Sequence, residues 1–349
     1  MTTHHYDRLT SALRLMNKTL ACFLFLILTA GTTFGYPVTL MIHPSKISES
    51  AETYRLFETS EELTDTDAFP LYEKAIQQMP KGVNQKKIHE WFKLPFEQFP
   101  QKEAENVIQK YSESLRLVAR ATRCGKCNWP QWKPGQVPPD VKGYRDLAYI
   151  LRTQARLDYS RGRHKDTLAA MQTSFGIAKH LGQAPTIIQA MVGGAIGGVT
   201  CREIESFVQC KDSPNLYAAL ANLPEPLTDV NIAIESESAN LKDYNILLRK
   251  QFEKQLKPAH EKVRLNAKRL DNHVKALQVV ESIRHYAATH DGQLPEALSD
   301  IKDQEVPNDL ISGKAFEYRR TVEGAMLKSA IPEGGKEKDT IHYEIELKK

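Results

Sequence analysis

The sequence predicts a mainly α-helical protein with an N-terminal transmembrane helix, an array of helical hairpins and a small C-terminal α+β module, in which a helix packs on a short antiparallel sheet. Three observations predict this fold class. An apolar segment lies near the N-terminus, apolar residues recur every three or four positions through the middle of the chain, and residues near the C-terminus alternate as they do in strands. With 349 residues, 41% of them hydrophobic, the chain can form one large core or two ordinary ones.

The N-terminal apolar segment predicts a membrane anchor. Residues 19–42 carry no charge and are long enough to cross a hydrocarbon layer of about 30 Å. Three basic residues before this segment predict that residues 1–18 stay in the cytoplasm. A cleaved signal peptide is the alternative. We therefore expect a single-pass protein of the inner (cytoplasmic) membrane. Residues 19–42 would make the membrane one of its partners, and the C-terminal domain would be extracytoplasmic.

The remaining chain divides into three parts. Residues 43–68 are polar and acidic and predict a spacer, residues 69–258 predict a helical domain, and residues 259–349 predict a long helix followed by an α+β tail. Inside the helical domain, the apolar spacing predicts helices over residues 70–79, 101–123, 186–209 and 227–256, together with a hairpin whose turn lies at residues 160–163. Pro258 is expected to break the chain before the last long helix, which ends near Thr289.

The charge distribution gives little indication of a nucleic-acid partner. The net charge is +4, and half of it lies in the first eighteen residues, so the rest of the chain is close to neutral and we expect no nucleic-acid binding. From Lys242 to Lys275, however, ten Lys or Arg residues stand against four Asp or Glu. A solvated helix face explains this excess, because the basic residues are expected to spread round the helix. Contact with anionic lipid or an acidic partner is the alternative.

The C-terminal segment contains a recognisable series of turns. A helix ends near Tyr286, the motif Gly292-x-Leu294-Pro295 turns the chain, and Val306-Pro-Asn-Asp leads into a strand that begins near Phe316. This segment, about residues 275–349, resembles the globular part of G-type pseudopilins of type II secretion systems. Similar tails occur in uncharacterised membrane-anchored bacterial helical proteins, which this chain also resembles in its helical middle. The resemblance implies a helix packed on a small antiparallel sheet.

The pseudopilin resemblance also implies calcium binding in an acidic loop near the C-terminus. At the matching positions, Glu333, Glu337 and Asp339 could offer oxygen ligands. Two lysines in the same loop weaken its negative charge. A long helical domain separates the tail from the apolar segment, so the chain is not itself a pseudopilin and the tail predicts a shared fold rather than a shared function.

The motif Cys124-Gly-Lys-Cys127 could be a redox pair, half of a metal site or the end of a helix. The predicted helix precedes the motif, so the negative end of the helix dipole lies beside Cys124. This end disfavours the thiolate that redox catalysis needs. Cys201 and Cys210 would be about 13 Å apart on one helix, which is too far for a shared zinc ion. We therefore expect disulfides that join Cys124 or Cys127 to one or both of Cys201 and Cys210.

One carboxylate interrupts an apolar helical face. Glu237 lies in the stripe that begins at Val230, and a buried ion pair with Arg152 or Arg156 is the expected arrangement. A general base with a raised pKa is the alternative.

These observations favour a non-catalytic binding or scaffolding protein of the cell envelope with an unknown protein partner. A helical groove lined by apolar and arginine residues would support that function. The first alternative is an envelope thiol–disulfide enzyme, or another enzyme, that uses Cys124 and Cys127 or Glu237. The second is an accessory of a secretion or pilus-like apparatus, which depends on the resemblance of the tail alone.

Overall fold

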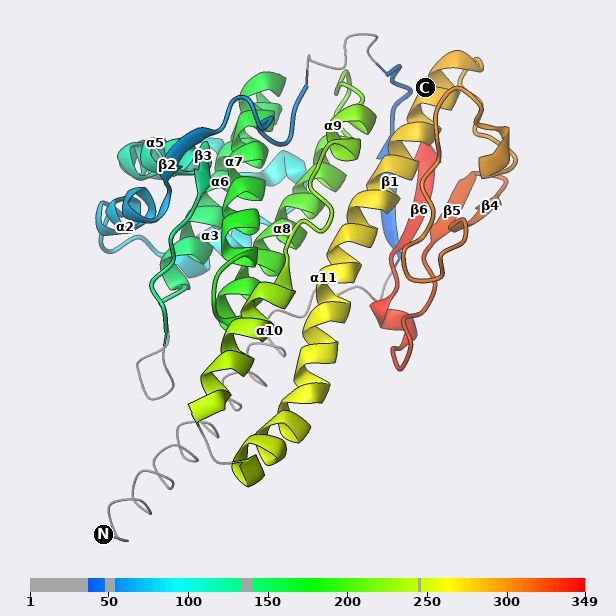
Figure 1. Cartoon of the computed structure of the whole chain (residues 1–349). Coiled ribbons are helices and arrows are strands. Elements are labelled where there is room, and N and C mark those ends of the chain that lie inside the picture. Colours follow the sequence, from blue (N-terminus) through cyan, green and yellow to red (C-terminus); the bar gives the residue numbers. More distant parts are fainter. Residues whose placement is uncertain (1–36, 48–53, 133–139, 244–245, 349) are drawn as a thin grey trace, which may run out of the picture.

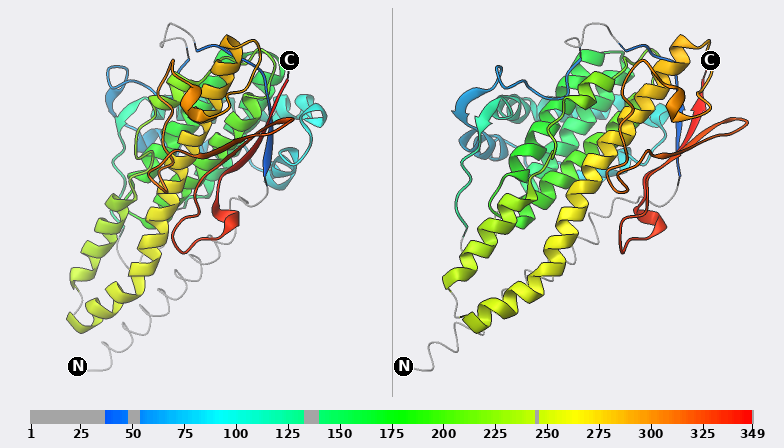
Figure 2. Two further views of the ribbon diagram at one scale, coloured as in Figure 1. Left: turned by 90° about the vertical axis from the view of Figure 1, so that its right-hand side faces the viewer. Right: turned by 45° about the vertical axis from the view of Figure 1, so that its right-hand side comes forward.

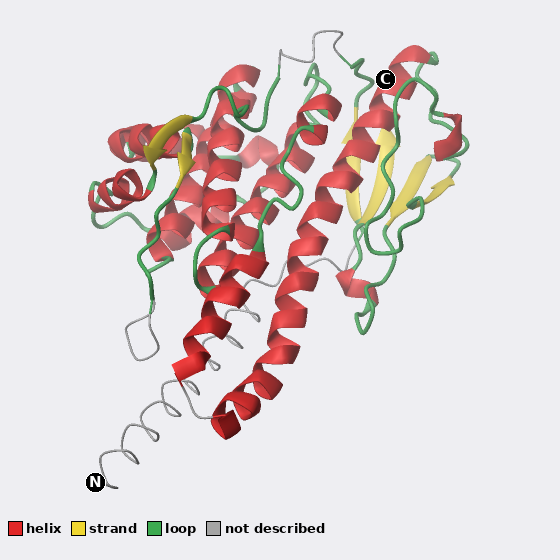
Figure 3. Ribbon diagram, in the orientation of Figure 1, coloured by secondary structure: helices red, strands yellow, loops and turns green. Residues whose placement is uncertain are grey.

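The structure, a computed structural model, describes residues 37–47, 54–132, 140–243 and 246–348. Helices form the centre of the molecule, and a small sheet lies beside the C-terminal half of the longest helix (Figures 1 and 3). Most buried apolar side chains of the helices and of the sheet belong to one continuous core, and a second, smaller cluster of buried apolar residues lies apart from it.

Four helices form the N-terminal part of the bundle. They are α2 (Phe69–Gln77), α3 (Gln85–Trp91), α4 (Gln101–Lys110) and α5 (Ser112–Ala121). The single helix that the sequence predicts over residues 101–123 is therefore two helices. The break falls at Tyr111, whose ring is buried and whose hydroxyl accepts a hydrogen bond from Gln85 Nε2 at 2.9 Å.

Three adjacent helices form the centre of the bundle (Figure 1). They are α6 (Lys142–Ser160), α7 (His164–Gly182) and α8 (Ile187–Phe207). The predicted hairpin is confirmed, and Gly162 makes its turn with a φ of +69°. The predicted close packing of the glycine-rich helix is also confirmed, because a Cβ on Gly193 would lie 2.6 Å from the carbonyl oxygen of Ala178 on α7.

The second half of the bundle differs from the prediction. After α9 (Tyr217–Ala221), helix α10 (Val230–Ala239) ends in a short 3-10 turn, and α11 (Ile246–Thr289) returns in the opposite direction (Figures 1 and 2). The predicted helix over residues 227–256 and the predicted break at Pro258 are both wrong. A proline removes one helical hydrogen bond and can bend a helix, and the good helix formers on either side of Pro258 let α11 continue through it.

The larger sheet combines both ends of the described chain. Its strands are β1 (Val38–Ile42), β4 (Glu317–Arg320), β5 (Gly324–Lys328) and β6 (His342–Leu347), in the order β1-β6-β5-β4. Strands β4, β5 and β6 are antiparallel neighbours, whereas β1 is parallel to β6 with Leu40 opposite Ile345. A second, two-stranded parallel sheet pairs β2 (Thr64–Asp67) with β3 (Cys124–Lys126).

Strand β1 corrects the predicted transmembrane helix over residues 19–42. Val38–Ile42 is extended and pairs with β6, and the side chains of Leu40 and Ile42 are fully buried in the core. No helix among the described ranges is long and apolar enough to cross a bilayer. The predicted span is therefore wrong, and the single-pass topology and inner-membrane localisation that depend on it are corrected with it. Residues 1–36, which include most of the apolar segment, lie outside the described part of the chain.

Candidate functional site

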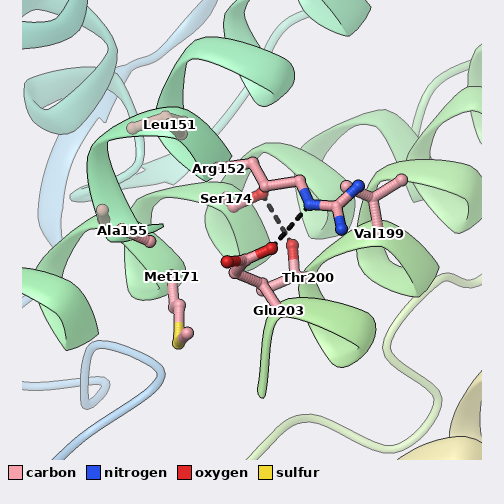
Figure 4. Close-up of a pocket in the computed structure, with 9 residues that line it drawn as sticks. Leu151, Arg152, Ala155, Met171, Ser174, Val199, Thr200 and Glu203 are labelled. Carbon is pink, nitrogen blue, oxygen red and sulfur yellow. Dashed lines mark hydrogen bonds and ion pairs between the residues drawn. The ribbon is translucent and has the colours of Figure 1, made fainter. Parts of the chain in front are cut away.

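A buried ion-pair cluster joins α6 to α8 (Figure 4). The Glu203 carboxylate on α8 is almost fully buried and accepts hydrogen bonds from Arg152 Nε at 2.6 Å, Arg156 Nε at 3.1 Å and the Tyr159 hydroxyl at 2.8 Å. Burial raises the pKa of Glu203, but the two guanidinium groups together outweigh burial and hold that pKa below its usual value. The cluster is therefore a charged, hydrogen-bonded connection between two helices.

The Arg152–Glu203 cluster leaves little space for a ligand. Phe92 covers both arginines, with its ring centre 4.0 Å from Arg152 Cζ and 5.0 Å from Arg156 Cζ. The adjoining cavity, which Thr200 and other side chains of α6, α7 and α8 line, has a volume of about 10 Å³. This volume is about that of one water probe, so the cluster serves the packing of the bundle.

Glu237 does not pair with Arg152 or Arg156, contrary to the expected arrangement. Its Oε1 instead accepts a hydrogen bond of 2.8 Å from the backbone nitrogen of Ile187, at the start of α8. Burial raises the pKa of Glu237 to about 7, although this hydrogen bond opposes the increase. The two arginines pair with Glu203, which our sequence reasoning missed. Arg152 and Arg156 lie four positions apart, on one face of a helix. Two cations on one face indicate a carboxylate opposite them, and this was the available signal for Glu203.

The structure places the CGKC motif on β3 and in the loop after it. Cys124 is 2% exposed, and its Sγ lies 3.1 Å from Thr66 Oγ1 on β2. Burial raises the pKa of the Cys127 thiol far above its usual value. Cys124 therefore lacks the exposure of a redox cysteine, and the pKa of Cys127 is shifted in the direction opposite to the one that activates such a thiol.

The four described cysteines are free thiols, so the predicted disulfides are wrong. Cys201 is fully buried within α8, and Cys210 Sγ contacts the backbone oxygen of Ser206 at 3.7 Å. The CGKC loop is held by hydrogen bonds instead. His180 Nε2 lies 3.1 Å from the Cys124 oxygen, and Trp129 Nε1 donates to the His180 oxygen at 2.9 Å.

The proposed calcium ligands do not gather at one point. The Glu337 carboxylate forms an ion pair with Lys328, Asp339 lies 3.5 Å from Arg269 Nη1, and Glu333 is exposed. Within the ranges that the structure describes, no three His, Cys, Asp or Glu side chains are grouped as they would be around a metal ion. Calcium binding stays a prediction from the resemblance.

A groove between α4 and α6 is the candidate binding site. Its volume is about 460 Å³, which falls in the usual range for ligand sites. Its lining combines two apolar side chains, three amides and four charged groups: Lys102, Glu105, Asn106, Ile108, Gln109, Gln154, Leu157, Asp158 and Arg163. Arg161 forms a two-pronged ion pair with Glu105, with both N–O distances at 2.9 Å.

One carboxylate oxygen in this α4–α6 groove lacks a partner. Asp158, in the last turn of α6, is 3% exposed, and its Oδ1 accepts a hydrogen bond from Arg163 Nη2 at 2.5 Å. Its Oδ2 is also buried, and it accepts no hydrogen bond from any residue that the structure describes. Burial raises the pKa of Asp158, and the Arg163 guanidinium opposes that increase. The wall of the groove therefore contains a buried acceptor that has no hydrogen-bond partner among the described residues.

Comparison with protein-family models, curated proteins and solved structures gives no significant match to this chain. The pseudopilin resemblance of residues 275–349 and the expected envelope function therefore stay predictions. The α4–α6 groove is the feature of the described structure that points to a function.

Proposed function

We propose that this chain is a non-catalytic binding or scaffolding protein that holds an extended peptide segment of a protein partner in the α4–α6 groove. The observation that carries the proposal is the unpartnered Oδ2 of Asp158. A buried acceptor without a hydrogen bond costs about 1–3 kcal/mol. A ligand that donates an N–H or O–H group to this oxygen would recover that energy.

The walls of the groove suit a peptide. The side chains of Asn106, Gln109 and Gln154 each carry both a donor and an acceptor, as does every peptide unit of an extended chain. Ile108 and Leu157 add apolar surface for a side chain. Together these groups match alternating backbone and side-chain contacts better than they match a compact ion.

The charges of the groove favour a neutral donor at Asp158. Arg163 already compensates the carboxylate through Oδ1, and Lys102 adds a second cation to the lining. A backbone amide or a hydroxyl group of the partner can therefore meet Oδ2 without adding another positive charge.

The enzymatic alternatives have weaker support. The CGKC thiols are held in or near the core, and Glu237 is engaged by a backbone amide at the start of α8. The accessory role in a secretion apparatus depends only on the resemblance of the tail.

An array of immobilised extended hexapeptides, each with a different central residue, tests the proposal. We expect a subset of peptides with central Ser, Thr or Asn to retain the full chain. Asp158→Asn should lower the affinity for these peptides about tenfold or more, because it replaces one of the two carboxylate acceptors with an NH₂ donor. Asp166→Asn is the matched control, since Asp166 also faces Arg163, at 3.8 Å, but is not part of the groove lining.

A second groove variant keeps the test independent of folding. Gln109→Ala changes an exposed amide of the wall and should weaken the same peptides while leaving thermal unfolding unchanged. Failure of every peptide to bind, or equal binding by wild type and Asp158→Asn, would overturn the proposal.

A further inference from the structure

Helix α11 aligns five cations that are far apart in sequence. With about 100° of rotation per residue, Lys254, Lys257, Arg264 and Lys268 all fall within about 40° of Lys250 round the helix axis. All five residues are exposed. The expectation that the basic residues spread round the helix is wrong for these five, because α11 continues through Pro258 as one helix. We call these five residues the cation stripe.

The cation stripe faces away from the body of the protein. Val263, Ala267 and Leu270 on the opposite side of α11 are buried, and the first two pack with α8 and α10 in one apolar cluster. The first part of α11 extends with α10 beyond the rest of the helical bundle (Figure 2). The stripe therefore begins on the projecting part of α11 and covers about 27 Å at 1.5 Å per residue.

Few carboxylates among the described side chains neutralise the stripe. Lys257 Nζ lies 4.0 Å from Glu261 Oε1, and Arg264 Nε donates to the neutral side chain of Asn231 at 3.0 Å. Within the described part of the chain, Lys250, Lys254 and Lys268 form no ion pair with a carboxylate. A linear row of cations with this little compensation is complementary to a linear row of anions.

We infer that the cation stripe is a docking surface for an acidic helix of a protein partner. The cations follow one another at intervals of four, three, seven and four residues, which are the intervals at which residues recur on one face of a helix. Glu261 interrupts the row on the same face and is exposed. A protein helix can place a cation opposite Glu261, whereas a uniform phosphate backbone would be repelled there, so a protein partner fits better than a nucleic acid.

The test measures binding of the full chain to a synthetic helix with glutamates along one face, and to the same helix with glutamine in their place. We expect the acidic helix to bind, the glutamine helix not to bind, and the affinity to fall as salt rises from about 50 to about 300 mM. The triple variant Lys250→Glu, Lys254→Glu and Lys268→Glu should lose at least about tenfold in affinity.

A matched charge reversal separates the stripe from the net charge of the protein. Lys86→Glu, Lys87→Glu and Lys110→Glu change three exposed cations elsewhere and alter the net charge equally, and this variant should bind as the wild type does. Equal loss in the two triple variants would overturn the inference, as would absence of binding to the acidic helix. Tighter binding to single-stranded DNA or to anionic vesicles than to the acidic helix would also overturn it. The α4–α6 groove is unchanged in both variants, so failure here leaves the peptide-binding proposal intact.

Discussion

The Tyr343 hydroxyl on β6 donates a hydrogen bond of 2.7 Å to Glu205 Oε1 on α8, although 138 positions separate the two residues. The same carboxylate oxygen lies 2.7 Å from His273 Nε2 on α11. One buried acid thus connects the C-terminal sheet to two helices of the bundle. The α+β tail is therefore fixed to the helical core by specific polar contacts as well as by apolar packing.

Tyr343→Phe should destabilise the protein by about 1–3 kcal/mol, because it removes a hydrogen bond to a buried carboxylate and leaves that acid less well satisfied. The midpoint of urea unfolding measures the change. Tyr286→Phe is the control, since the Tyr286 ring is only partly buried and its hydroxyl accepts or donates no hydrogen bond within the described residues. Equal effects of the two substitutions would contradict the role of the Tyr343 hydroxyl.

Glu237 should make the stability of the protein fall between pH 5 and pH 8. Burial raises the pKa of its folded form to about 7, from an ordinary value of 4.5, so the folded state holds a proton that the unfolded state has released in this range. Its stabilising contribution is complete below about pH 4.5 and is lost as the pH rises through 7. The difference in unfolding free energy between wild type and Glu237→Gln should therefore change in favour of the variant as the pH rises.

Glu203→Gln is the comparison for the Glu237 measurement. This substitution leaves two buried cations without their anion, and we expect a loss of about 3–5 kcal/mol at neutral pH. The pKa of Glu203 is lowered, so its contribution is present above the ordinary carboxyl pKa and is lost only as the pH falls below it.

A flat difference between wild type and Glu237→Gln across pH 5 to 8 would show that Glu237 is ionised in the folded protein.

The cysteines should all react with an alkylating reagent in denaturant without reductant. With Cys22 replaced by serine, the intact mass should show modification of all four described cysteines, since they are free thiols. In native buffer Cys124 and Cys201 should be protected, because both are buried. Protection of any pair in denaturant would instead reveal a disulfide and restore the connection that the sequence suggested.

Local sequence patterns predicted which segments are helical. They predicted less well where each helix ends and which element it packs against. The helices over 142–160 and 164–182 follow from apolar spacing, because each buries one face against its sequence neighbour. Strand β1 could not be predicted, since its apolar residues continue an apolar segment and its partner β6 lies at the other end of the chain. The helix α11 continues through Pro258 although proline locally favours a break, and the good helix formers on either side of the proline support this continuity.

The candidate site was less predictable than the fold. The α4–α6 groove depends on the break at Tyr111 and on the turn after α6, and neither leaves a motif in the sequence. Arg152 and Arg156 pair with Glu203 rather than with Glu237 because α8 packs against α6, whereas α10 packs against α8 and α11. Sequence spacing identifies the residues on one face of a helix, but it does not identify which other element packs against that face.

Gly193 and Gly194 provide a matched test of the close approach between α7 and α8. A Cβ on Gly193 would lie 2.6 Å from the Ala178 oxygen and 2.9 Å from the Gly182 nitrogen, so both helices would have to move. A Cβ on Gly194 would meet nothing within 4 Å. We expect Gly193→Ala to destabilise by about 1–3 kcal/mol through overpacking. Gly194→Ala should stabilise by about 0.5–1 kcal/mol, because alanine favours the helix. Chemical denaturation of both variants checks this, and stabilisation by both would mean that α7 and α8 are farther apart than the structure places them.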